Sequence, residues 1–129
     1  MSQHILVVDD EVQIRELLSV YLKRQGYVVS DAANGTQTLA KLGQSPVDLV
    51  VLDIGLENED GLRVLERIKT THPKVHVVML TGLGFVEDLL EEALEKGAAG
   101  YVSKVRALDE LHMAIQRVFK QDPPKESAA

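Results

Sequence analysis

Short apolar segments alternate along this chain with longer stretches in which apolar residues recur every three or four positions. The short segments predict strands, and the longer stretches predict amphipathic helices. Five strand-and-helix pairs follow one another, which favours a parallel sheet whose strands are linked by helices. The first, third and fourth segments are nearly all apolar, as expected where helices cover both faces of the sheet. The predicted strands are residues 4–8, 28–32, 47–52, 75–80 and 100–103.

Each predicted helix has an inward apolar stripe, a stop signal, or both. The first places Ile14, Leu17, Leu18 and Tyr21 on one face, and Gly26 follows as its stop. Gly or Pro also follows three of the other predicted helices as a stop. The second helix is predicted at residues 36–42, before Gly43, and the fourth at residues 87–96, before Gly97. The third helix has the apolar stripe Leu62, Leu65 and Ile68 and ends at His72 and Pro73. The fifth helix has the apolar stripe Leu108, Leu111, Ile115, Val118 and Phe119.

Length and composition are those of one soluble globular domain. The chain has 129 residues, of which 45% are hydrophobic and 26% charged. No apolar run approaches the roughly 20 residues that span a bilayer, and the first residues do not resemble an export signal. We therefore expect a cytoplasmic protein with no membrane segment. The net charge of −6 argues against direct nucleic-acid binding, which relies on Lys and Arg.

Polar side chains follow four of the predicted strands. Asp9 and Asp10 come directly after the first strand, Asp53 after the third, Thr81 after the fourth, and Lys104 after the fifth. Right-handed crossovers bring the carboxyl ends of parallel strands to one edge of the sheet, where ligands bind. The sequence therefore predicts that three carboxylates, a hydroxyl group and an ammonium group share a crevice.

Clustered carboxylates repel one another unless a cation relieves the repulsion. Oxygen ligands favour Mg²⁺, and Lys104 adds positive charge on another side of any anion that enters. Phosphoryl transfer needs a nucleophile with cations around it, and Asp53 is the natural nucleophile. A simpler interpretation stays open for two of these features: Asp9, Asp10 and Glu11 can serve as a helix N-cap, and Asp53 can cap the loop that follows it.

Five separated motifs carry a resemblance to a known family. In chain order they are Ile5-Leu6-Val7-Val8-Asp9-Asp10-Glu11, Asp48-Leu49-Val50-Val51-Leu52-Asp53, Asp60-Gly61, Leu80-Thr81-Gly82 and Gly100-Tyr101-Val102-Ser103-Lys104. Together they resemble the receiver domain of two-component response regulators, the CheY-like superfamily. The match covers almost the whole chain, from about residue 4 to residue 120.

This resemblance implies a flavodoxin-like, doubly wound (βα)5 fold with five parallel strands in the order 2-1-3-4-5. Residues 1–120 would form the receiver domain, and residues 121–129 a flexible tail or the start of a linker. A sensor histidine kinase or a phosphotransfer protein would donate a phosphoryl group to Asp53. The domain would then catalyse no reaction other than its own phosphorylation and dephosphorylation.

The resemblance also implies a metal site and a switch. Asp10 and Asp53 would bind Mg²⁺ through their carboxylates, Asp9 would act mainly through water, and the backbone carbonyl of Gly55 would complete the protein ligands.

Thr81 and Lys104 would each contact a phosphoryl oxygen. Tyr101 would then turn inward as Thr81 moves, and this would change the surface formed by the fourth helix, the fifth strand and the fifth helix.

The sequence departs from the family pattern at two prolines. Glu57 replaces the proline four residues after the acceptor, and Val105 replaces the one after Lys104. Both loops should therefore have more conformational freedom. Glu57 and Glu59 also add negative charge beside the site.

Two other functions stay open: a metal-dependent phosphatase or transferase acting on an outside substrate, and a pseudo-receiver that keeps the fold but does not respond to phosphate.

The output of the domain is not determined by these motifs. Because Met1 comes just before the first strand, we expect an N-terminal or free-standing receiver. It would control a missing effector domain, relay the phosphoryl group, bind a downstream protein, or form a homodimer through the fourth helix, fifth strand and fifth helix. Leu83 and Phe85 are the expected contact residues.

The four histidines, 4, 72, 76 and 112, show no metal-ligand spacing, and we interpret them as structural.

Overall fold

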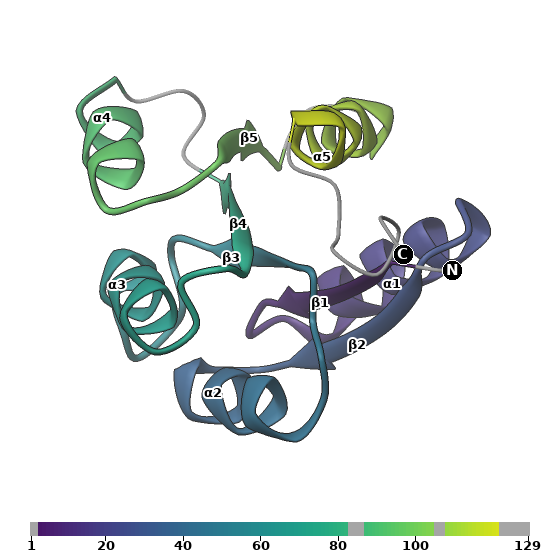
Figure 1. Ribbon diagram of the computed structural model, residues 1–129, viewed down its shortest axis with the longest axis horizontal. Helices are drawn as coiled ribbons and strands as arrows, with labels where there is room; N and C mark the ends of the chain where they lie inside the picture. The colour runs from purple at the N-terminus through teal and green to yellow at the C-terminus, as the bar shows by residue number, and fades with distance from the viewer. Residues whose placement is uncertain (1–2, 83–86, 105–107, 122–129) are drawn as a thin grey trace.

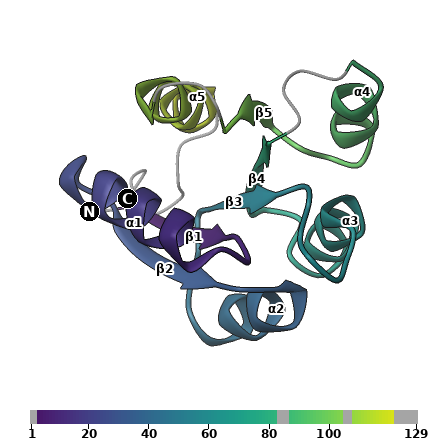
Figure 2. The same ribbon diagram turned by 180° about the vertical axis from the view of Figure 1, so that it is seen from behind.

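A computed structural model describes residues 3–82, 87–104 and 108–121. Five parallel strands form one sheet in the order β2-β1-β3-β4-β5, and helices lie on both of its faces (Figures 1 and 2). The strands are β1 (His4–Val8), β2 (Val28–Ala32), β3 (Leu49–Asp53), β4 (His76–Thr81) and β5 (Gly100–Ser103). The helices are α1 (Val12–Arg24), α2 (Gly35–Gln44), α3 (Gly61–Thr71), α4 (Glu87–Glu95) and α5 (Leu108–Gln121).

This architecture confirms the predicted fold class and strand order. The chain moves from β1 outward to β2, and then returns to place β3 on the other side of β1. The direction of strand addition therefore reverses between β1 and β3. In open parallel sheets such a reversal leaves a crevice at the carboxyl ends of the two strands, where ligands bind.

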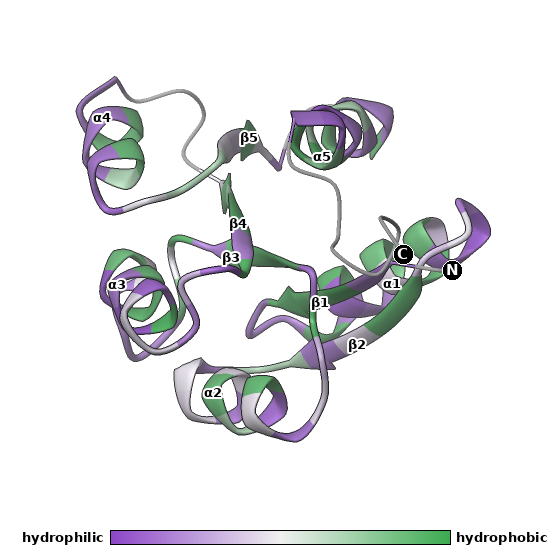
Figure 3. Cartoon of the chain, viewed as in Figure 1, coloured by the Kyte–Doolittle hydropathy of each residue, from purple (hydrophilic) through white to green (hydrophobic). Residues whose placement is uncertain are grey.

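The central strands are buried on both faces, as their apolar sequences predict. Leu6 and Val8 of β1 belong to the core layer beneath α2, α3 and α4, while Ile5 and Val7 belong to the layer beneath α1 and α5. All four side chains are fully buried. Burying a side chain of this size stabilises the fold by about 1.5–3 kcal/mol. Figure 3 shows many of the hydrophobic positions along these strands. The sheet is therefore a rigid platform for the residues that follow its strands.

Several element bounds differ from those predicted. β3 begins at Leu49 and includes Asp53, and β4 runs from His76 to Thr81. The sheet continues to these polar residues because backbone pairing does not depend on side-chain polarity; Asp53 pairs with Leu80 in the β3–β4 register. Asp53 and Thr81 are thus held by strands and not by loops.

The inward face of α1 was predicted one residue too wide. Leu18 and Leu22 are buried, but Leu17 is 52% exposed, so its assignment to the core was wrong. Successive residues of a helix are rotated by about 100°, and Leu17 lies at the edge of the stripe that faces the sheet.

Two glycines adopt the left-handed conformation that ends helices. Gly26 follows α1 with a φ of 100°, and Gly97 follows α4 with a φ of 104°. Both predicted stops are confirmed. The third, Gly43, is not a stop, because α2 continues to Gln44.

No helix within the described ranges is long and apolar enough to cross a membrane. The predictions for Leu83, Phe85, Val105 and the tail from residue 122 onward lie outside the described residues. α5 ends at Gln121, one residue beyond the predicted domain boundary.

Candidate functional site

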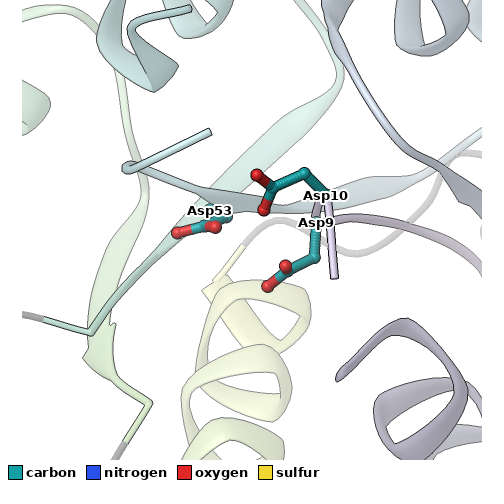
Figure 4. Close-up of side chains that lie close together, drawn as sticks. All are labelled: Asp9, Asp10 and Asp53. Carbon is teal, nitrogen blue, oxygen red and sulfur yellow. The ribbon is translucent and has the colours of Figure 1, made fainter. Parts of the chain in front are cut away.

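Three carboxyl groups meet at the carboxyl ends of β1 and β3. Asp9 and Asp10 follow β1, and Asp53 is the last residue of β3. One oxygen atom from each lies within 4.8 Å of the others (Figure 4). Asp9 and Asp53 are buried, and Asp10 is half-buried. The structure thus brings together the three aspartates that the sequence places at strand ends.

Lys104 places its ammonium group in this cluster. Its Nζ lies 2.8 Å from Asp9 Oδ2 and 3.0 Å from Asp53 Oδ2. The backbone N–H of Lys104 donates to the carbonyl oxygen of Thr81 at 2.7 Å, which fixes the start of the lysine side chain beside β4. One cation therefore neutralises part of the charge of two buried carboxylates.

Burial and charge shift the proton affinity of two of these groups. Burial raises the pKa of the Asp9 carboxyl group, and the charge of Asp53 acts in the same direction, against hydrogen bonds from Lys104 and from the N–H of Glu11. Burial alone would lower the pKa of Lys104. Hydrogen bonds to Asp9 and Asp53, with their negative charges, outweigh burial and raise it. The ammonium group therefore stays charged at neutral pH as an internal counterion.

The acidic residues after β1 do not act as a side-chain helix cap. The N-cap of α1 is Glu11, and its side chain makes no capping hydrogen bond. Asp9 Oδ1 instead accepts a hydrogen bond from the N–H of Glu11 at 2.9 Å, which orients the Asp9 carboxylate. At the other strand, Asp53 Oδ1 accepts from the N–H of Gly55 at 3.1 Å. Both side chains are thus fixed by the backbone two residues further on.

The residues predicted to form the switch lie on β4 and β5. Thr81 is fully buried at the end of β4, beside Ser103 of β5. Tyr101 pairs in register with Met79, packs half-buried against the core beneath α2, α3 and α4, and has a buried hydroxyl oxygen. Thr81 therefore lies on β4, the strand next to β3 and its acidic residue, and Tyr101 lies on β5, one strand further out.

The segment between β3 and α3 folds tightly back onto Asp53. Gly61 opens α3 and donates its N–H to the carbonyl oxygen of Ile54 at 3.0 Å. Asp60 caps α3, because its Oδ1 accepts from the N–H of Leu62 at 2.9 Å. Glu57 is exposed.

Glu59 was predicted to add negative charge beside the site, but its carboxylate binds elsewhere. Its Oε1 accepts a hydrogen bond from the backbone N–H of Gly35, the first residue of α2. A carboxylate at a helix N-terminus is stabilised by the partial positive charge there. This contact joins the segment after Asp53 to α2.

Arg15 also contacts the site, and the motifs did not identify it. Its Nη1 donates to the backbone carbonyl oxygen of Asp9 at 2.7 Å, and its Nε lies 3.0 Å from Asp31 Oδ2. Only its burial marks it as unusual, because its side chain is 15% exposed although arginine is charged.

Three of the predicted structural histidines make contacts within the fold. The ring of His4 bonds Pro46 and Ser30, that of His112 bonds Tyr27, and that of His72 contacts Thr71.

The donor set of the acidic cluster fits a hard divalent cation. Carboxylate oxygens are the ligands that Mg²⁺ prefers, and it needs only a few of them because it keeps waters and phosphate oxygens. Three carboxylates share this cluster with the one ammonium group of Lys104, so negative charge remains for a divalent cation to offset. The residues present therefore fit a magnesium site.

Lys104→Met is expected to weaken the fold and to strengthen divalent-cation binding. Methionine leaves the buried Asp9 and Asp53 without their shared counterion, and breaking such a pair costs about 3 kcal/mol. A divalent ion then relieves a larger repulsion, so its affinity should rise about tenfold. Urea unfolding and calorimetric titration with Mg²⁺ measure both effects. The control is Lys120→Met, at the exposed end of α5. Unchanged stability and affinity in the Lys104 variant would contradict this account of its role.

Comparison with known proteins gives consistent matches. Residues 5–116 match the family model of the response regulator receiver domain. Sporulation initiation phosphotransferase F of Bacillus subtilis is 34% identical over 117 residues, which cover 91% of this chain and 94% of that protein. A putative NtrX-like response regulator of Rickettsia felis is 40% identical over 120 residues, which cover 91% of this chain and 25% of that protein.

Among solved structures, the chemotaxis protein CheY4 of Vibrio cholerae superposes with a TM-score of 0.86 and 27% sequence identity. The match covers 92% of this chain and 99% of that one. The chain thus spans 25% of the NtrX-like relative and nearly the full length of the phosphotransferase and the chemotaxis protein.

Proposed function

This chain belongs to the response regulator receiver domain family, and from that premise we propose that Asp53 accepts a phosphoryl group from a histidine kinase or a phosphotransfer protein. The observation that carries the proposal is the placement of Asp53. It ends a buried strand, shares a cluster with Asp9 and Asp10, and pairs with Lys104. This arrangement combines a nucleophilic carboxylate with groups that offset the charge of a phosphoryl group.

The proposed transfer step uses the groups placed around Asp53. A carboxylate oxygen of Asp53 attacks the phosphorus atom of a phosphohistidine on the partner. A phosphorus–oxygen bond forms while the phosphorus–nitrogen bond breaks, and the electron pair returns to the imidazole nitrogen. Lys104, which lies 3.0 Å from Asp53, moves its ammonium group onto an oxygen of the transferred group. Thr81 donates its hydroxyl hydrogen to another oxygen.

The metal-binding roles stay with the acidic cluster. The carboxylates of Asp10 and Asp53 and the backbone carbonyl of Gly55 would hold Mg²⁺, and Asp9 would act mainly through water. When bound, the ion offsets the negative charge that develops on the phosphoryl oxygens. Asp9 also keeps Lys104 in place before transfer, through the contact of 2.8 Å.

The proposed output is a change of the surface formed by α4, β5 and α5. Thr81 moves toward the phosphoryl group, and Tyr101 repacks in the space that it leaves. The Tyr101 hydroxyl oxygen is already buried, so the change is a shift of a packed ring and not the insertion of an exposed one. This surface controls a partner protein or an effector domain, or it forms a homodimer.

We extend the proposal to the remaining properties of the chain. The receiver unit spans residues 1–120 together with Gln121, the last residue of α5, and the residues after it form a tail or linker. The domain is cytoplasmic, binds no nucleic acid directly, and catalyses only its own phosphorylation and dephosphorylation. The presence of Asp9, Asp10, Asp53, Thr81 and Lys104 at one edge supports a responsive receiver over a pseudo-receiver.

Magnesium dependence of phosphoryl uptake tests the proposal. The wild-type protein is incubated with a small phosphodonor, with Mg²⁺ in one sample and a chelator in the other, and its intact mass is measured. We expect the mass of one phosphoryl group to be added with Mg²⁺ and none with the chelator. An unchanged mass in the presence of both donor and Mg²⁺ would rule out the proposed function.

A further inference from the structure

Arg15 joins the acidic cluster to the neighbouring edge strand. It lies in the first turn of α1, and its side chain contacts both the segment after β1 and strand β2. Nη1 donates to the carbonyl oxygen of Asp9 at 2.7 Å, and Nε donates to Asp31 Oδ2 on β2 at 3.0 Å. Two edges of the rigid guanidinium group are therefore held at once.

The carbonyl group that Arg15 binds belongs to the peptide unit between Asp9 and Asp10. The orientation of this peptide plane sets the direction in which both aspartate side chains leave the backbone. Strand pairing fixes the backbone on the N-terminal side of this peptide unit, since the N–H of Asp9 donates to the carbonyl oxygen of Ala32 at 3.2 Å. Arg15 fixes the other side by a charge-assisted hydrogen bond, which is stronger than a neutral one.

We propose that Arg15 is a positioning residue for the divalent-cation site, with Asp31 as its anchor. This inference rests on the metal site proposed above. Arg15 holds the Asp9–Asp10 peptide so that both carboxylates face Asp53 before the ion arrives. Groups that orient metal ligands in this way typically change metal affinity by tenfold or more when they are replaced.

Charge and positioning predict opposite effects, which makes the inference testable. Arg15 is a cation near three carboxylates. If its charge alone mattered, removing it would strengthen the attraction between the cluster and a divalent cation. If Arg15 positions the ligands, removing it weakens binding. Arg15→Lys retains the charge but cannot hold two acceptors in the fixed geometry of a guanidinium group.

Titration with Mn²⁺, followed by the paramagnetic resonance of the free ion, measures affinity directly. We expect affinity to fall about tenfold in Arg15→Gln and Arg15→Lys. Asp31→Asn should give a smaller fall in the same direction, because Arg15 keeps its bond to Asp9. Arg24→Lys is the matched control, on the exposed last turn of the same helix, and should bind as the wild type does.

A second measurement separates positioning from loss of folding. Urea unfolding identifies any variant that is not folded. If the Arg15 variants do not fold, the Mn²⁺ affinity of Asp31→Asn is compared with that of the wild type instead. At saturating Mg²⁺ the rate of phosphoryl uptake should return to the wild-type value, because Arg15 itself does not touch Asp53 within its observed contacts. Folded Arg15 variants that bind Mn²⁺ as tightly as the wild type, or more tightly, would overturn the inference alone. A wild-type protein that binds no Mn²⁺ would overturn the proposed metal site and this inference with it.

Discussion

The Asp53→Asn variant is expected to take up no phosphoryl group under conditions that modify the wild-type protein. A carboxamide has nearly the shape of a carboxylate, but its oxygen is a poor nucleophile. The carboxamide oxygen can still accept the hydrogen bond that Asp53 Oδ1 receives from Gly55, and Lys104 keeps its contact with Asp9. The variant also loses the repulsion between Asp53 and Asp9. Its free energy of unfolding should therefore stay within about 2 kcal/mol of the wild-type value.

Intact-mass measurement after exposure to a small phosphodonor and Mg²⁺ checks this result. Asp60→Asn is a suitable control, because Asp60 caps α3 from the same connecting segment and asparagine caps equally well. The control should be phosphorylated as the wild type is. Uptake by folded Asp53→Asn at the wild-type rate would show that another residue is the acceptor.

Gly61→Ala should be among the most damaging single changes in this chain. A Cβ atom at Gly61 would overlap the carbonyl oxygen of Asp53 and lie 2.6 Å from Ile54 Cα and 2.8 Å from the Ile54 carbonyl oxygen. These are all backbone atoms, so no side-chain rotation relieves the overlap. The backbone of Asp53 must move or α3 must shift, and we expect a loss of about 3 kcal/mol of stability.

The same displacement should slow phosphorylation. A shift of about 1 Å in a reacting group can reduce a rate about 100-fold. Urea unfolding and the rate of phosphoryl uptake measure the two effects. Gly43→Ala is the matched control: Gly43 lies within α2, a Cβ there meets no atom within 4 Å, and alanine should stabilise the helix by about 0.5–1 kcal/mol. If Gly61→Ala were as stable and as readily phosphorylated as the wild type, the close packing described here would not matter.

Local sequence patterns contain most of the information that specifies this fold. The bounds of β1, β2 and β5 agree with those predicted, because each apolar segment is flanked by clear breaks. The ends of β3 and β4 were missed because strand pairing continues into Asp53 and Thr81, whose polarity resembles that of a loop. Strand order 2-1-3-4-5 was implied by family resemblance, since hydrophobic periodicity alone does not say which strands are neighbours.

The candidate site was predicted in part for a similar reason. Asp9, Asp53 and Lys104 lie at or directly after strand ends, and the parallel topology brings these strand ends together at one edge of the sheet. Arg15 and Glu59 could not be predicted in this way, because each reaches another element through a long side chain: Arg15 contacts Asp31 of β2 as well as Asp9, and Glu59 contacts the backbone N–H of Gly35 in α2. Such contacts depend on the final positions of β2, α1 and α2, which a pattern of apolar residues does not describe.

The most direct test of the central claim is to trap the acyl phosphate and find its position in the chain. Borohydride reduces an aspartyl phosphate to homoserine, which survives proteolysis and peptide sequencing by mass spectrometry. After incubation of the wild-type protein with a phosphodonor and Mg²⁺, homoserine is predicted at position 53 and at no other aspartate. Homoserine at position 9 or 10, or a phosphoryl group only on a hydroxyl or an imidazole side chain, would contradict the assignment of Asp53 as the acceptor.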